Sequence, residues 1–278
     1  THLLGNACEV EKLMALAEPR GIAVIEDCAH ALFARRHGLY AGLFGHFAAF
    51  SFNHRKHLST GQGGALLINS DYYAERSRYE TYNRLPARIT WNYAMPSIVA
   101  AIGLAQWPRA KDYVRKDHEL AKLFDRAVGD RDWLRPQHIP AENYSSSLCW
   151  GALFEGERRG ITYDEFMKVL EGHGGDQFAR SWMPEGAFGM APSPAYRYPL
   201  FSEPRAYGKG CPTRCPHYEG QVDYGPGACP TAEYVVPRML NVGLTPGTDR
   251  TIQRSAEALA KTMAHFDGRP KRARGAEG

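Results

Sequence analysis

The chain has 278 residues, enough for one large domain or two modest ones with a hydrophobic core. Its hydrophobic content of 44%, its charged content of 23% and its net charge of +4 are ordinary for a globular protein and do not indicate nucleic-acid binding. No stretch approaches the roughly 18 apolar residues of a membrane span, and no signal peptide is visible. These features predict a cytoplasmic protein that binds neither nucleic acid nor membrane.

Both ends of the chain give expectations about its extent. The chain starts at Thr1 without an initiator Met and enters a helical pattern almost at once, so we expect a fragment that begins inside a domain. The basic run Arg269–Arg274 is typical of a solvated terminus, and we expect a disordered basic tail over 269–278.

The first ninety residues alternate helical and strand patterns. A helix is predicted over about 8–18. Three apolar runs typical of parallel strands buried on both faces follow at 21–25, 47–52 and 64–69. Asp71 then caps a polar helix that reaches about Asn83. This alternation predicts an α/β layered sheet.

The rest of the chain contains longer helices and more loops. Ser97 is expected to cap a helix that Pro108 breaks before a second helix begins. A strand pattern at 147–154 and a helix at 162–172 precede a loop-rich section that holds most of the prolines. A helix over 248–266 is predicted to close the fold.

The segment 50–64, Phe-Ser-Phe-Asn-His-Arg-Lys-His-Leu-Ser-Thr-Gly-Gln-Gly-Gly, carries the clearest chemical signal. Lys56 lies in a loop whose glycines permit close approach of the backbone to a ligand. Its amine is suited to a Schiff base if burial beside cationic groups depresses its pKa. An exposed loop lysine without a function is the alternative.

Three other side chains fit the same chemistry. Asp27 ends an apolar run, where α/β sheets place ligands, and could hold a ring nitrogen protonated; a helix cap is the alternative. His30 could contact a cofactor ring or be a core histidine. Ser51 points opposite to Phe50 and Phe52 if the strand alternates, which suits a phosphate, and otherwise it is a buried serine bonded to backbone. An amine, a carboxylate and a hydroxyl in this order predict a pyridoxal-phosphate site.

The cysteines give a separate signal. Cys8, Cys28 and Cys149 have apolar neighbours and are expected to be free buried thiols. Ligand types that could bind zinc occur later, at Cys211, Cys215, His217 and Cys229. Their spacing is loose and prolines adjoin them, so we expect a proline-stiffened insertion near 205–229 that holds neither a metal nor a disulfide.

The motifs F-S-F-x-x-x-K-x-L-S-T-G-x-G-G and V-I-E-D-x-A-H resemble those of the DegT/DnrJ/StrS-type sugar aminotransferases. These are pyridoxal-phosphate enzymes of fold type I that aminate keto-sugars and keto-cyclitols. Further segments that look like family motifs lie at 1–5, 91–95, 100–106 and 229–233. The resemblance therefore covers roughly 1–266 and includes a long, specific motif rather than a short isolated one.

The resemblance implies an α/β fold, that of the fold-type-I pyridoxal-phosphate transferases. It predicts an incomplete, mostly parallel-sheet large domain over 1–90 and a smaller α+β C-terminal domain over 91–268, which includes an interdomain helix. Family members carry an N-terminal segment with further cofactor and substrate contacts that is missing here. We therefore expect that this fragment could be unstable or inactive by itself.

The resemblance also implies roles for individual residues. Lys56 would form the Schiff base and carry the proton during transamination, and Asp27 would pair with the pyridinium nitrogen. His30 would lie against the ring, and Ser51 would hold the phosphate. Asn92 would reach the phosphate of the neighbouring subunit's cofactor, which predicts a homodimer with shared active sites.

The predicted function is transfer of an amino group from glutamate or glutamine to a nucleotide-linked keto-sugar or a keto-cyclitol, in polysaccharide or antibiotic biosynthesis. A sugar dehydratase of the same fold is one alternative. Such relatives carry His in place of the lysine, so Lys56 favours transamination, although His54 and His57 lie nearby. A non-catalytic or inactive member of the family is the other alternative.

Overall fold

The structure is a computed structural model that describes residues 1–77, 93–180, 193–202, 218–245 and 248–269. The chain forms two compact units. Unit 1 comprises Thr1–Ala127, Gln137–Trp150 and Gly243–Glu257, and unit 2 comprises Val128–Pro136, Gly151–Val242 and Ala258–Gly278. The predicted domain boundary at residue 90 stays a prediction. Residues 270–278 of the predicted disordered tail lie outside the described residues.

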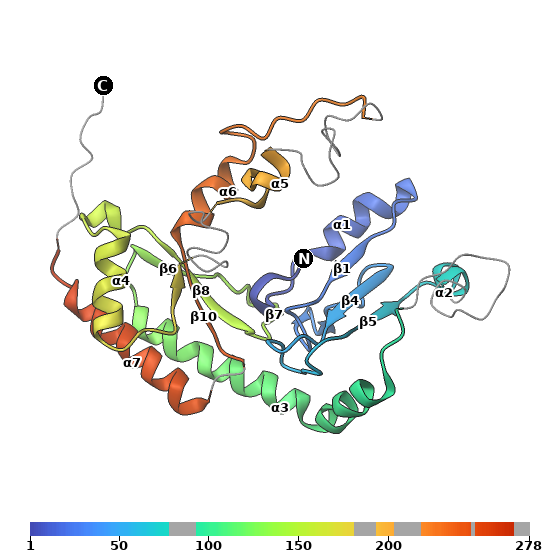
Figure 1. Cartoon of the computed structure of the whole chain (residues 1–278), viewed down its shortest axis with the longest axis horizontal. Coiled ribbons are helices and arrows are strands. Elements are labelled where there is room, and N and C mark those ends of the chain that lie inside the picture. The colour runs from blue at the N-terminus through green and yellow to red at the C-terminus, as the bar shows by residue number, and fades with distance from the viewer. Residues whose placement is uncertain (78–92, 181–192, 203–217, 246–247, 270–278) are drawn as a thin grey trace. The chain divides into compact units, whose positions relative to one another are not determined.

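Unit 1 is built on a three-stranded sheet of order β1-β4-β5 (Figure 1). β1 (Ile25–Asp27) pairs in parallel with β4 (Phe47–Ser51). β4 pairs antiparallel with β5 (Gly64–Ile68), and Ser51 lies opposite Gly64. The mixture of sheet and helix agrees with the α/β fold class predicted from the sequence.

Two details of the predicted sheet are wrong. The run 64–69 was expected to be a parallel strand, but β5 is antiparallel to β4. The connection 52–63 contains no helix, and a parallel return requires a crossover connection that is usually helical. The first strand also begins only at Ile25, so most of the apolar run 21–25 precedes it.

A second small sheet of unit 1 has the order β3-β2-β7. Its strands are antiparallel and comprise Arg35–Arg36 (β2), Leu39–Tyr40 (β3) and Asn143–Tyr144 (β7). The buried guanidinium of Arg36 lies 2.7 Å from a carboxylate oxygen of Glu11 and 3.0 Å from one of Glu142. Because Glu11 belongs to α1 (Val10–Ala17), Arg36 joins that helix to this sheet.

Helix α3 (Ser97–Val128) is continuous through Pro108, so the predicted break is wrong. Proline lacks the N–H that would bond to the carbonyl of Leu104 one turn earlier. Both Leu104 and Pro108 are exposed, so water can satisfy that carbonyl without ending the helix. The opposite face of α3 is buried at Ala110, Val114 and Phe124.

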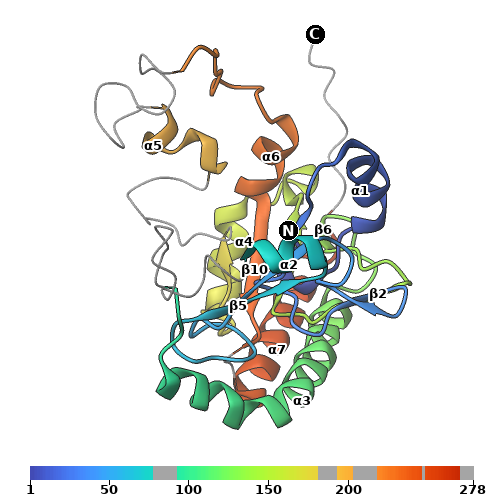
Figure 2. The ribbon, with the colours of Figure 1, turned by 90° about the vertical axis from the view of Figure 1, so that its right-hand side faces the viewer.

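Unit 2 contains a four-stranded sheet of order β6-β8-β10-β9. The strands are β6 (Leu134–Pro136), β8 (Cys149–Phe154), β10 (Met239–Gly243) and β9 (Ala179–Arg180). Helix α4 (Tyr163–Gly172) lies beside this sheet in both views (Figures 1 and 2). Its cap is Thr162, whose hydroxyl accepts a hydrogen bond from the amide of Glu165 at 3.1 Å.

The remaining described helices are α2 (Asp71–Ser77), α5 (Pro199–Ser202), α6 (Pro230–Val235) and α7 (Asp249–His265). Short 3-10 turns occur at Leu3–Gly5, Glu18–Arg20, Gly156–Arg159, Ala195–Arg197 and Val236–Arg238. Among the helices described, none combines the length and the apolar character needed to cross a membrane.

The core of unit 2 is an aromatic cluster around Trp133. The ring centroid of Trp133 lies 6.0 Å from those of Phe154 and Phe266 and 5.9 Å from that of Phe166, in edge-to-face geometry. Leu170 of α4 is fully buried in the same unit. These aromatic rings and Leu170 are buried together in the core of unit 2.

We predict that Leu170→Ala lowers the free energy of unfolding by about 2 to 5 kcal/mol, because it removes a fully buried side chain and leaves a cavity. Urea unfolding followed by tryptophan fluorescence measures this, since Trp133 lies in that unit's core. Leu13→Ala is the matched control on α1, where the side chain is exposed, and should change stability by less than about 0.5 kcal/mol. Equal losses for the two variants would contradict the assigned core.

Candidate active site

Asp27 and Lys56 approach each other because β1 and β4 are parallel neighbours. Asp27 is the last residue of β1, and Lys56 lies in the loop after β4. The carboxyl ends of parallel strands meet at one edge of a sheet, which is where open α/β sheets bind ligands. Asp27 interacts electrostatically with both Lys56 and His30. The structure thus brings three of the predicted site residues together, and their roles stay predictions.

The carboxylate of Asp27 keeps capacity for a ligand. One oxygen accepts a hydrogen bond from the amide of Ala29 at 3.0 Å, and the other accepts one from the hydroxyl of Thr1 at 3.3 Å. A carboxylate offers about four acceptor positions, so a protonated ring nitrogen can still bind. The exposed Asp27 side chain is reachable from outside the sheet.

The surroundings of Lys56 favour its free amine, which is the nucleophilic form. Burial lowers the pKa of Lys56, while Cys149 and Asp27 oppose that shift. The side chain is half-buried, so the shift does not depend on complete removal from water. A lowered pKa raises the fraction of free amine at neutral pH, and the free amine is the form that attacks a carbonyl carbon.

The loop that carries Lys56 depends on its glycines. Gly61 and Gly63 have positive φ angles of +81° and +139°. A Cβ atom on Gly63 would lie 2.7 Å from the methyl carbon of Met95, and one on Gly64 would lie 2.4 Å from the carbonyl oxygen of Phe50. These positions therefore require glycine, and the loop backbone can approach a ligand closely.

Gln106 fixes this loop to α3, a role that the sequence analysis missed. Its amide nitrogen donates to the carbonyl of Ser59 at 2.6 Å, and its amide oxygen accepts from the Ser59 N–H at 3.3 Å. Gln106 ends the family-like stretch 100–106, but a polar residue on a helix gives no sign of a partner 47 positions away.

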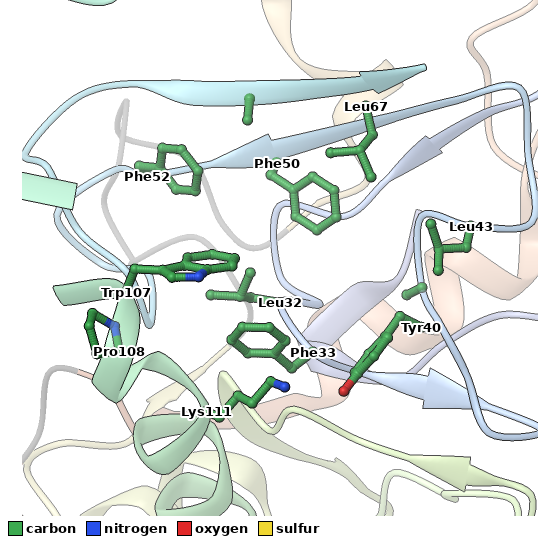
Figure 3. Close-up of a pocket in the computed structure, with 12 residues that line it drawn as sticks. Leu32, Phe33, Tyr40, Leu43, Phe50, Phe52, Leu67, Trp107, Pro108 and Lys111 are labelled. Carbon is green, nitrogen blue, oxygen red and sulfur yellow. The ribbon is translucent and has the colours of Figure 1, made fainter. Parts of the chain in front are cut away.

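Ser51 lies on the opposite side of β4 from a large apolar cavity. Its hydroxyl accepts a hydrogen bond from the amide of Asn53 at 3.3 Å. Its neighbours Phe50 and Phe52 line a cavity of about 550 Å³ together with Trp107 (Figure 3). Because side chains alternate along a strand, the hydroxyl of Ser51 faces away from this cavity.

His30 is held as a neutral ring. Burial, aided by the charge of Lys56 and opposed by Asp27, lowers the pKa of His30 to about 4. Its Nδ1 accepts a hydrogen bond from the amide of Leu4 at 3.4 Å, which places the ring proton on Nε2. A neutral imidazole beside Lys56 adds no positive charge to the site.

Glu26 fixes the end of β1 directly before Asp27. Its buried carboxylate accepts hydrogen bonds from His2 Nε2 at 2.9 Å and from the amides of Gly42, Phe44 and Gly45 at 2.6–2.8 Å. Burial acts to raise the pKa of Glu26, but these hydrogen bonds lower it. In the sequence, Glu26 stands out only as part of the motif V-I-E-D-x-A-H.

Cys28 lies near His2 and Glu26 in an arrangement compact enough to hold a metal ion. Both nitrogens of His2 are already engaged, because Nδ1 accepts from the amide of Cys8 at 3.1 Å while Nε2 contacts Glu26. The cluster is therefore explained by hydrogen bonding between its members.

The other predicted site residues are only partly described. Asn92, Cys211, Cys215 and His217 lie outside the described residues. Cys229 is exposed, and the described cysteines Cys8, Cys28, Cys149 and Cys229 are free thiols. Of the three thiols predicted to be buried, Cys28 is buried, whereas Cys8 and Cys149 are half-buried.

Comparison with known proteins identifies the family. A model of the DegT/DnrJ/EryC1/StrS aminotransferase family matches residues 1–177. The chain belongs to this family. The solved structure of a DegT DnrJ EryC1 StrS aminotransferase from Brucella abortus superposes with a TM-score of 0.70 at 22% identity, covering 96% of this chain and 63% of that one. DesV from S. venezuelae gives a TM-score of 0.73 at 19% identity, covering 94% and 63%. The fold is thus that of the fold-type-I aminotransferases, as predicted.

Two curated relatives are named as a perosamine synthase and a sugar aminotransferase. GDP-perosamine synthase of Escherichia coli O157:H7 is 35% identical over 134 residues, which cover 46% of this chain and 37% of the relative. The dTDP-4-dehydro-2,3,6-trideoxy-D-glucose 4-aminotransferase of Saccharopolyspora spinosa is 24% identical over 285 residues, which cover 95% and 64%. The chain spans less than two thirds of the length of each of these relatives.

We predict that Gln106→Ala loosens the loop that carries Lys56 (the lysine loop) without unfolding unit 1. Two hydrogen bonds worth about 1 kcal/mol each are lost, so amide hydrogen exchange in the peptide that covers 53–63 should accelerate roughly tenfold or more. Hydrogen exchange with mass spectrometry measures this peptide directly. Arg109→Ala, at an exposed position of the same helix, should leave the exchange unchanged. Unchanged exchange in Gln106→Ala would show that other contacts hold the loop.

Proposed function

We propose that this chain is part of a pyridoxal-phosphate-dependent aminotransferase. The enzyme would move an amino group from glutamate or glutamine to a keto-sugar or a keto-cyclitol. The observation that carries the proposal is the approach of Asp27 to Lys56, an amine whose pKa is lowered, at the carboxyl edge of the sheet. Membership of an aminotransferase family supports it. Pyridoxal phosphate, when bound, supplies an electron sink for negative charge on the carbon that bears the amine.

The residues of unit 1 fit the parts of this cofactor. The carboxylate of Asp27 would hold the ring nitrogen and its proton, and the neutral ring of His30 would lie against the cofactor ring. The hydroxyl of Ser51 and the backbone of the Gly61–Gly64 loop would bind the phosphate. Close backbone approach is possible there because glycine occupies the tight positions.

Lys56 would serve two purposes in the reaction. Its free amine would hold the cofactor in the resting enzyme through the aldehyde carbon, with the aldehyde oxygen leaving as water. Released by the amino donor, the same amine would move a proton between the donor carbon and the cofactor. Burial supports both purposes, because it lowers the pKa of Lys56 and so keeps the amine able to accept a proton.

The relatives' names support a nucleotide-linked sugar as the acceptor, since they refer to GDP-, UDP- and dTDP-sugars.

A homodimer is part of the proposal. The first turns of α3 expose Ile98, Leu104 and Trp107, whose exposed fractions are 74%, 72% and 51%. Apolar side chains gathered on one helix in this way suit a protein interface. A cytoplasmic location stays a prediction.

The sugar dehydratase alternative is not favoured. Neither nearby histidine takes the place of Lys56. His54 is exposed, and its amide donates to the carbonyl of Gly61. His57 is buried and directed toward Asp117.

We predict that pyridoxal phosphate forms a borohydride-fixable bond with Lys56. The purified chain should show a new visible absorption band on addition of the cofactor, and after borohydride a pyridoxyl group should appear on the peptide that contains Lys56. Lys56→Ala should lose both signals. Lys111→Ala is the control, because Lys111 lines the apolar cavity on the other face of β4 and should not matter (Figure 3).

Absence of the band in this chain, followed by its absence in a chain extended to the length of the relatives, would overturn the proposal. A pyridoxyl group spread over several lysines in place of Lys56 would also contradict it. A band only in the extended chain would support the predicted need for an N-terminal segment.

A further inference from the structure

His57 follows Lys56 directly and inserts its ring among buried groups of unit 1. Its Nε2 lies 3.4 Å from a carboxylate oxygen of Asp117 on α3, and the two side chains are only 2% and 7% exposed. The hydroxyl of Thr245 donates a hydrogen bond to the same oxygen of Asp117. The residue after the lysine is therefore connected to α3 and to the segment that follows β10.

The hydrogen bonds around His57 leave one position open. One ring nitrogen contacts the backbone of Ser146. Among the described residues, Nε2 has no hydrogen-bond partner at bonding geometry. A buried nitrogen without a partner costs free energy, and the Asp117 carboxyl can supply the missing proton.

We propose that His57 and Asp117 share one proton and that this buried pair is a positioning device for Lys56, which attaches the lysine segment to α3. A carboxylic acid that donates to a neutral imidazole satisfies both groups without burying a net charge. An ion pair would bury two charges and is costlier in a site so little exposed to water. The hydroxyl of Thr245 completes the chain of hydrogen bonds.

Below about pH 6 the surroundings favour this neutral form. Burial, aided by Lys56 and His30, lowers the pKa of His57 to about 4, while the Ser146 backbone opposes the shift. Burial raises the pKa of Asp117 to about 6 against the Thr245 hydroxyl. The titratable groups that face the pair are Lys56, His30, Lys116, Cys149 and Asp249.

The number of protons bound by the pair determines how it affects the pH dependence of stability. Between pH 4 and pH 6 the folded chain holds one proton, on Asp117, with His57 neutral. The unfolded chain also holds one, on His57, because the ordinary pKa values are 6.5 for His and 3.8 for Asp. Equal proton numbers mean that the pair adds no pH dependence to the unfolding constant in this range.

Removal of either partner should expose opposite slopes. In Asp117→Asn, His57 has a pKa of about 4 in the folded state and 6.5 in the unfolded state, so between these values only the unfolded state holds a proton. The unfolding constant should therefore fall about tenfold per pH unit from pH 4 toward 6.5. In His57→Leu the folded state binds more protons, because the pKa of Asp117 is about 6, so the constant rises about tenfold per unit from pH 4 to 6.

Urea unfolding of the 278-residue chain at half-unit pH steps tests this, with Asp112→Asn as the matched control at an exposed position of α3. The control and the double variant His57→Leu/Asp117→Asn should keep the wild-type pH profile. Slopes in the two single variants that match the wild type, or that have the same sign, would overturn the inference.

Thr245→Val covers the case in which the single variants fail to fold. Loss of the hydroxyl should raise the pKa of Asp117 above its value of about 6, so the folded variant keeps a proton that the folded wild type loses. The ratio of the variant's unfolding constant to that of the wild type should therefore rise with pH just above pH 6. A profile identical to that of the wild type would contradict the shared proton.

The positioning role rests on the proposed function and has its own readout. Fixation of pyridoxal phosphate on Lys56 by borohydride should fall several-fold in Asp117→Asn and stay unchanged in Asp112→Asn. Absence of fixation in the wild type would reject the proposed function and leave the unfolding slopes informative. Normal fixation in Asp117→Asn would reject the positioning role alone.

Discussion

The parallel pairing of β1 with β4 is the constraint on which the candidate site depends. It places the end of β1, with Asp27, beside the start of the loop that carries Lys56. The strand β1 is only three residues long, so its position needs support beyond its ladder. Glu26 gives that support through hydrogen bonds to His2 and to three backbone amides. A buried carboxylate therefore holds the strand so that the next carboxylate can stay exposed and able to bind.

The lysine loop is held by contacts of three different kinds. Glycines at 61, 63 and 64 allow its tight course, Gln106 bonds to its backbone at Ser59, and His57 inserts beside Asp117. The last two contacts both reach α3, which explains why the continuity of this helix matters for the site. A break at Pro108, between Gln106 and Asp117, would separate the two attachment points. Because Pro108 is exposed, the helix continues through it and both attachment points stay on one element.

The sequence predicted the parts of the site that follow from local pattern. Apolar runs located β4 and β5, although most of the run 21–25 precedes β1. The order of Asp27, Ser51 and Lys56 along the chain indicated one ligand. It could not predict the direction of β5, because an apolar run reads alike in both directions. The contact between Asp117 and His57 could not be predicted either, because the two residues lie 60 positions apart and only the tertiary fold buries them together. Contacts of this range leave no periodic signal in the chain.

Burial, more than ion pairing, determines the protonation states of Lys56 and of the two histidines near it. Both neighbouring imidazoles are kept neutral, because burial lowers the pKa values of His30 and His57 to about 4. Without two imidazolium charges nearby, Asp27 is not neutralised by histidine and remains available to a cationic ring nitrogen. The amine itself keeps a lowered pKa although Asp27 opposes it, so desolvation outweighs the carboxylate at this position. A ligand that carries a carbonyl carbon, a protonatable ring nitrogen and a phosphate would meet a complementary group for each in this arrangement, which is the physical basis for the proposed pyridoxal-phosphate site.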